Sequence, residues 1–164
     1  MIVNSINKQQ VFDFLAKIPD PEIPVITIEE LGILRDVEMT GNICTITITP
    51  TYTGCPAMRV IEDDIKSVLK EKGIENVKII MVYSPAWTTD WMSNAVKEKL
   101  RKYGIAPPEH SFDKNSLTGK PKVVLCPQCG SSHTQMTSQF GSTACKALYK
   151  CLDCKEPFDY FKCL

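Results

Sequence analysis

Two C-x-x-C pairs near the end of the chain have the residue type and spacing of a metal site. Cys126 and Cys129 form the first pair, Cys151 and Cys154 form the second, and 21 residues separate the pairs. Each pair can present two thiolates from a tight turn, and two such turns complete a tetrahedron around one ion. The sequence therefore predicts a four-cysteine zinc ribbon. Zinc is favoured over iron, and a closed tetrathiolate site predicts a structural role.

A second candidate for chemistry is Cys55, in the segment 49–58 (TPTYTGCPAM). This segment joins an alternating run at 43–49, typical of a strand, to a run with helical spacing of apolar residues at 58–72. We therefore expect Cys55 at a helix N-terminus, where unpaired N–H groups and the helix dipole favour thiolate. Gly54 would allow a sharp turn and leave room beside the sulfur. The alternative is a buried structural cysteine.

Two loops carry further candidate residues. Asp20 and Glu22 lie in Asp-Pro-Glu-Ile-Pro, whose prolines hold both carboxylates on an extended backbone. A solvated turn is the alternative.

Trp87 and Trp91 follow the alternating run 77–83, and if that strand pairs beside the preceding one, they emerge at the same end of the sheet as Cys55. They could wall a pocket around the thiol or bind a partner; the alternative is core packing, with Trp91 the more buried.

Three cysteines remain. Cys44 shares the apolar face of its strand and is interpreted as a core residue. Cys145 lies in Phe-Gly-Ser-Thr-Ala-Cys-Lys, where Gly and Ser suggest an exposed loop and Lys146 could favour thiolate. An extra functional thiol is one interpretation of Cys145, and a spare structural thiol is the other. No role is assigned to Cys163.

The apolar periodicity predicts an α+β protein with two modules. The first, residues 1–106, should be a small three-stranded sheet with packed helices, in the order α-β-β-α-β-α, its first helix capped by Ser5 and its last by Thr89 or Asp90. Residues 107–121, rich in proline, form the predicted linker. Residues 122–164 form the ribbon, a small β module with strands expected at 134–140, 147–151 and 157–163.

Composition excludes several classes of protein. The chain has 164 residues, with Lys+Arg and Asp+Glu both 19, so no net field attracts nucleic acid or acidic membrane. We expect a cytoplasmic protein, because neither a signal peptide nor a membrane span is recognisable and thiols persist as metal ligands in a reducing compartment. The two histidines, His110 and His133, form no E-x-x-H motif for a di-iron bundle, and neither a dinucleotide fingerprint nor a ferredoxin cysteine run occurs.

The motifs together resemble a known family. The Asp-Pro-Glu-Ile-Pro loop, Leu-Gly-Ile at 31–33, Arg-Asp-Val at 35–37, Thr-Pro-Thr at 49–51 and Gly-Cys-Pro at 54–56 are similar to the metal-sulfur cluster biosynthesis domain of iron-sulfur assembly accessory proteins. The two C-x-x-C turns, called knuckles below, are Cys126 with Cys129 and Cys151 with Cys154. Together with the segments 83–91 (YSPAWTTDW) and 140–146 (FGSTACK), they resemble the PaaD family of phenylacetyl-CoA epoxidase subunits. The resemblance extends from about residue 6 to residue 162 and covers both modules.

The resemblance implies an accessory subunit of a bacterial monooxygenase of phenylacetate degradation, with no oxygenase activity of its own. Cys55 would handle a transient iron ion or iron-sulfur cluster, with Asp20, Glu22, Thr51 and Thr53 as the other site residues. The other epoxidase subunits, oxygenase or reductase, would be its partners, and a homodimer could complete the site. Two alternatives remain open: a non-catalytic scaffold of the oxygenase complex, and a thiol oxidoreductase that pairs Cys55 with Cys145.

Overall fold

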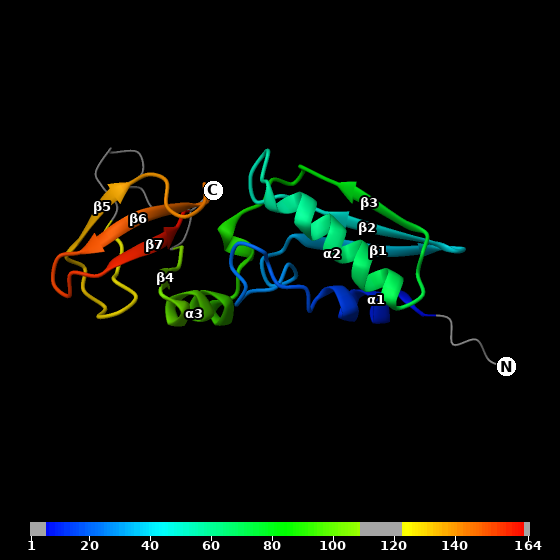
Figure 1. The fold of residues 1–164 in the computed structure, drawn as a ribbon, viewed down its shortest axis with the longest axis horizontal. Coiled ribbons are helices and arrows are strands. Elements are labelled where there is room, and N and C mark those ends of the chain that lie inside the picture. Colours follow the sequence, from blue (N-terminus) through cyan, green and yellow to red (C-terminus); the bar gives the residue numbers. More distant parts are fainter. Residues whose placement is uncertain (1–5, 109–122, 163–164) are drawn as a thin grey trace. The chain divides into compact units, whose positions relative to one another are not determined.

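The computed structural model describes residues 6–108 and 123–162 (Figure 1). The chain divides into two compact units, Met1–Trp87 and Thr88–Leu164, each with a sheet of its own. The mixed α+β class expected from the sequence is confirmed. Within the described residues, no helix has both the length and the apolar character needed to cross a membrane.

The first unit contains a three-stranded sheet in the order β1-β2-β3. Strands β1 (Leu34–Thr40) and β2 (Ile43–Ile48) pair antiparallel through a tight turn in which Gly41 has a φ of 61°. Strand β3 (Val77–Met81) pairs parallel with β2. Because β2 and β3 run in the same direction, the segments that follow them leave the same edge of the sheet. The sequence predicted that the Cys55 and Trp87 segments leave the same end of the sheet if β3 pairs beside β2, and the observed pairing confirms that condition.

Two helices cover the sheet of the first unit. Helix α2 (Ala57–Glu71) is the crossover between β2 and β3 and lies across one face of the sheet, and α1 (Lys8–Leu15) contacts both β1 and α2 (Figure 1). Helix α2 buries one apolar stripe, and β2 buries alternate residues on its inner face. The buried side chains of α1, β1, β2 and α2 are Val11, Leu15, Leu34, Val37, Cys44, Ile46, Ile48, Ala57, Met58, Ile61, Ile65 and Leu69.

The second unit contains a short 3-10 turn η1 (Thr89–Trp91), helix α3 (Asn94–Tyr103) and a four-stranded sheet in the order β4-β7-β6-β5. The strands are β4 (Ile105–Ala106), β5 (Thr134–Ser138), β6 (Lys146–Cys151) and β7 (Pro157–Phe161). Its core is aromatic: the Tyr149 ring stacks on Phe158 at 5.9 Å between centroids and meets Tyr160 edge-on at 5.7 Å. These contacts join β6 to β7, one of the two antiparallel strand pairs of the ribbon.

The division into units differs from the sequence-based boundary at residue 106. Strand β4 pairs parallel with β7, and α3 contacts β4, so α3 belongs to the second unit rather than the first. The periodic pattern showed a helix here but not which sheet it would join. Most of the predicted linker 107–121 lies outside the described residues.

Two predicted helix caps were also wrong. Asn7, not Ser5, caps α1 through a reciprocal capping box with Gln10, and Ser5 lies outside the described residues. Ser93 caps α3 in place of Thr89 or Asp90, because the residues 89–91 form the separate turn η1. The predicted end of α3 is confirmed, with Gly104 in the left-handed region at φ 94°.

Candidate metal centre and candidate thiol site

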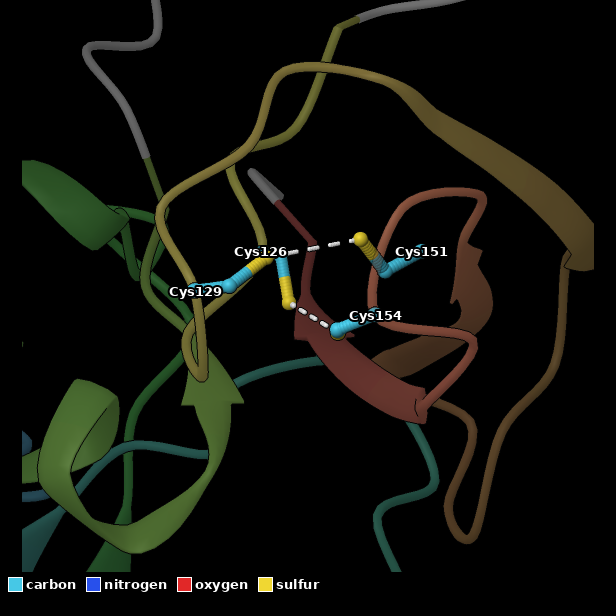
Figure 2. Close-up of side chains that lie close together, drawn as sticks. All are labelled: Cys126, Cys129, Cys151 and Cys154. Carbon is cyan, nitrogen blue, oxygen red and sulfur yellow. Dashed lines mark hydrogen bonds between the residues drawn. The ribbon is translucent and has the colours of Figure 1, made fainter.

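The four knuckle cysteines come together in the second unit (Figure 2). Cys126 and Cys129 lie before β5, Cys151 is the last residue of β6, and Cys154 lies on the turn between β6 and β7. Their Sγ atoms all lie within 4.8 Å of one another, with 3.7 Å between Cys126 and Cys154 and 3.6 Å between Cys129 and Cys151. A tetrahedron with metal–sulfur bonds of about 2.3 Å has edges of roughly 3.8 Å. The arrangement therefore fits one tetrahedral metal ion.

Backbone N–H groups point at the sulfurs of this centre. Ser131 donates to Cys129, and both Asp153 and Cys154 donate to Cys151. Burial opposes ionisation of Cys151, but these donors, with the Cys154 and Cys129 thiols, outweigh it and lower the pKa of Cys151 to about 6. Such N–H groups stabilise the negative charge that thiolate ligands retain.

The two turns share a backbone shape as well as a sequence spacing. The residue after the second cysteine of each pair has a left-handed φ, 75° at Gly130 and 69° at Lys155. Glycine adopts this conformation without strain, whereas Lys155 is held in it with its Nζ donating to the Leu152 carbonyl. Each turn thus folds back and directs its two sulfurs to the same point.

Cys55 lies at the junction of β2 and α2 and is half-buried. Pro56 is the N-cap of α2, and the Ala57 N–H donates to the Cys55 sulfur. The predicted position at the helix N-terminus is therefore correct. The expected preference for thiolate is not: burial raises the pKa of Cys55, and the helix N–H only partly offsets it. In the resting protein Cys55 is a neutral thiol at pH 7.

Glu22 lies near enough to Cys55 for its negative charge to raise the pKa of the thiol further. Asp20 has a different function in the same loop. It is buried, and its Oδ1 accepts the backbone N–H groups of Glu22 at 2.9 Å and Ile23 at 2.8 Å. Asp20 thus holds the loop in shape, and Glu22 is the carboxylate that acts on the thiol. The sequence alone ranked the two carboxylates equally.

The hydroxyl groups of Tyr52 and Thr51 hydrogen-bond to the Cys55 sulfur and favour its ionised form. The sequence pointed to Thr51 but not to Tyr52. Tyr52 stands three residues before Cys55, the spacing of a tight turn, and in the structure the Cys55 N–H donates to the Tyr52 carbonyl at 3.3 Å. Thr53, the other predicted site residue, is exposed. Gly54 has a φ of 82°, and no atom lies within 4 Å of the position that a Cβ would take there.

The predicted order of burial of the two tryptophans was wrong, and core packing, the alternative interpretation, holds for Trp87. Trp87 is buried, 5 % exposed, and its Nε1–H donates to the Leu31 carbonyl at 2.7 Å within the first unit. Trp91 is the less buried of the two and belongs to η1 in the second unit. Trp87 therefore packs in the core and does not offer its ring to a partner, because a buried indole N–H needs an acceptor and finds it in Leu31. Trp91 stays a predicted contact residue.

The structure places two of the three remaining cysteines. Cys44 is fully buried, as predicted, and burial raises the pKa of its thiol. Cys145 was expected on an exposed loop but is buried, and just before β6 begins its carbonyl accepts the Lys162 N–H at 3.0 Å. Its sulfur lies 3.0 Å from Thr143 Oγ1, and Lys146 is also buried. Cys163 lies outside the described residues.

Replacement of Glu22 by Gln is expected to increase the reactivity of Cys55. Loss of the nearby negative charge lowers the pKa of the thiol, and below that pKa each unit of lowering raises the thiolate fraction tenfold. We expect iodoacetamide to modify Cys55 in the variant up to about tenfold faster at pH 8, as followed by mass spectrometry of the Cys55 peptide. Glu29→Gln, an exposed glutamate in the following segment, is the control and should leave the rate unchanged. An unchanged or slower rate in Glu22→Gln would contradict the assigned effect of Glu22.

Comparison with known proteins gives one family match within each unit. Residues 8–81 match the family described as iron-sulfur cluster assembly protein, and residues 110–162 match the PaaD zinc beta ribbon domain. A crystal structure of a domain of unknown function, DUF59, from Bacillus anthracis is 31% identical and has a TM-score of 0.52, covering 57% of this chain and 90% of that one. The fold and site thus define an iron-sulfur-assembly type of protein with a metal-binding ribbon.

Similarity over nearly the whole length identifies the family. The chain is 48% identical over 94% of its length to an Escherichia coli (strain K12) protein described as a putative subunit of 1,2-phenylacetyl-CoA epoxidase, and the match covers 92% of that protein. The chain belongs to this PaaD family of epoxidase subunits. It is also 35% identical, over 55% of its length and 89% of the relative, to the Fe-S protein maturation auxiliary factor YitW of Bacillus subtilis. A maturation factor of Staphylococcus aureus, SufT, is 39% identical over 48% of this chain and 90% of the relative.

Proposed function

We propose that this chain is an accessory subunit of a phenylacetyl-CoA epoxidase that matures an iron or iron-sulfur centre in a partner subunit through Cys55. The observation that carries the proposal is the similarity, over nearly the full length, to a putative subunit of such an epoxidase, in a chain whose first unit matches iron-sulfur assembly proteins. Cys55 stands in that unit at the start of α2, half-buried and surrounded by hydrogen-bonding side chains. We expect no oxygenase activity from the chain alone.

Cys55 would take up its cargo by exchanging a proton for a metal. The resting thiol is neutral, and a metal ion that approaches the sulfur favours the thiolate and releases the proton. Glu22, whose negative charge acts on the thiol, is the candidate acceptor of that proton or oxygen ligand. Tyr52 and Thr51 stabilise the negative charge on the sulfur by hydrogen bonds. Only Cys55 and Glu22 would be ligands among these residues. A metal bound by so few ligands would be held weakly enough for transfer to the client.

The cargo site is incomplete within one chain. Among residues 6–108 and 123–162, the knuckle cysteines are the one group of three or more side chains able to hold a metal together. Iron or a cluster at Cys55 would therefore be shared, either with a second copy of the chain or with the client subunit. We propose zinc as the ion of the ribbon, because four thiolates in a closed tetrahedron suit it, and client docking as the ribbon's role. Such thiolate chemistry suits a reducing cytoplasm.

The test is the metal and acid-labile sulfide content of the chain purified without oxygen, compared with Cys55→Ser. We expect iron, with or without sulfide, beyond one zinc in the wild type, and zinc alone in the variant. Glu29→Gln is the control and should retain the iron. Zinc alone in both proteins would count against a carrier role for Cys55.

A structural scaffold of the epoxidase complex is the second candidate. The neutral, half-buried state of Cys55 favours it, because an inert thiol would have these properties. A scaffold would copurify with the oxygenase subunits in fixed stoichiometry, and Cys55→Ser would leave the activity of that complex intact. A maturation factor would be needed only until the client is loaded.

A further inference from the structure

The two metal-binding turns belong to different segments of the second unit. One precedes β5 and the other joins β6 to β7. One backbone bond ties them directly, from the Leu152 N–H to the His133 carbonyl at 2.8 Å. A metal ion needs the four sulfurs at a defined separation, so any further contact between the turns affects the geometry of the centre.

The Asp153 side chain supplies such a contact with both of its oxygens. Ser131 Oγ donates to Asp153 Oδ2, and His133 Nδ1 lies 3.1 Å from Asp153 Oδ1. The His133 N–H in turn donates to Ser131 Oγ at 2.9 Å, which leaves the hydroxyl proton for Asp153. A carboxylate accepts hydrogen bonds at both oxygens, so the Nδ1–H tautomer of His133 is the one that can donate to Asp153.

These contacts are linked to the sulfurs on both sides. The Ser131 N–H donates to Cys129, and the Asp153 N–H donates to Cys151. Cys129 Sγ and Cys151 Sγ are 3.6 Å apart. The side-chain bond between Ser131 and Asp153 therefore closes a ring that runs from one sulfur, through two backbone donors, to the other.

We propose that Ser131, His133 and Asp153 form a knuckle clamp that sets the separation of the two cysteine pairs and so strengthens metal binding. They are positioning residues that act through Cys129 and Cys151. The inference rests on the metal-binding role of the four cysteines and is independent of any function of Cys55. Disruption of the clamp widens the centre but leaves all four cysteine ligands in place, so β5, β6 and β7 stay paired while the ion is bound.

An exposed ion pair by itself contributes little to stability. The His133 and Asp153 side chains are 66% and 56% exposed, and pairs of this kind have small effects on unfolding. The clamp differs because the backbone N–H groups of Ser131 and Asp153 donate to the sulfurs of the metal centre, and partners of metal ligands change affinity by about 10- to 100-fold. Metal affinity is therefore the quantity that separates the clamp from an ordinary surface contact.

The experiment measures the zinc affinity of the full chain by competition with a chromophoric chelator. Asp153→Ala removes both side-chain bonds and should weaken zinc binding about tenfold. Asp153→Asn keeps one acceptor and should lie between this variant and wild type, which provides a measurement should the alanine variant fold poorly. Because Ser131→Ala removes the same side-chain bond to Asp153, the loss of zinc affinity in the double variant should be smaller than the sum of the two single losses.

Asp159→Ala is the matched control. Asp159 also accepts a serine hydroxyl, from Ser142 at 2.8 Å, in the same unit but away from the knuckles. We expect it to retain zinc affinity within twofold of wild type. With cobalt in place of zinc, the ligand-field bands should shift in Asp153→Ala and not in Asp159→Ala. Equal losses in the two variants, additive losses in the double variant, or wild-type affinity in Asp153→Ala would each overturn the clamp.

Discussion

Removal of the metal is expected to unfold the second unit and to leave the first unit folded. The ribbon has a small core and two turns that bring four sulfurs together. Without the ion, the small core leaves the turns unsupported, whereas structural zinc contributes about 10–16 kcal/mol in comparable small modules. The first unit has an apolar core of its own, built on β1, β2 and α2.

Amide NMR spectra before and after chelation would measure this effect residue by residue. Signals of β5, β6 and β7 should collapse to the random-coil region, those of β1, β2 and β3 should persist, and addition of zinc should restore the former. Cys151→Ser should reproduce the collapse, because it removes one buried ligand. Cys145→Ser, in the same unit but outside the metal centre, should retain bound zinc. Native ribbon signals from a chain shown to be metal-free would contradict the structural role of the ion.

Cys55→Ser is expected to reduce epoxidase activity, reconstituted with the partner subunits, to the level measured without this chain. A serine hydroxyl does not ionise near neutral pH and is a poor ligand for iron, so the cargo would not bind. The half-buried position makes the exchange of sulfur for oxygen tolerable, and we expect the free energy of unfolding to change by less than about 0.5 kcal/mol. Activity assays and thermal unfolding of the same preparation would check both results.

Cys44→Ser is the control, and we expect it to lower the stability of the protein while leaving the epoxidase activity intact. Cys44 is fully buried on the inner face of β2, and a hydroxyl there would cost about 1–3 kcal/mol of stability. The folded protein should nevertheless support the epoxidase, because Cys44 lies outside the Cys55 site. Full activity of Cys55→Ser would remove the maturation role and favour the scaffold. Equal loss of activity in both variants, together with equal destabilisation, would indicate an effect on folding alone.

The sequence by itself determined what depends on local pattern. Alternation at 43–49 and helical spacing at 58–72 predicted β2 and α2, and therefore placed Cys55 between them. The C-x-x-C spacing predicted the metal centre because each pair is a local turn, and any fold that joins two such turns produces the same four-sulfur arrangement. These features extend over a few residues, so their geometry is encoded in neighbouring positions.

Only the tertiary structure decided what depends on residues far apart in the chain. Trp87 is buried because its indole N–H reaches Leu31, which is 56 positions away. Glu22 acts on Cys55 across a loop, and burial in the folded unit reverses the thiolate preference that the helix N-terminus alone would give. Helix α3 joins the second unit because β4 pairs with β7. Periodicity identifies a buried face but not its partner, since packing and desolvation arise only when distant segments meet.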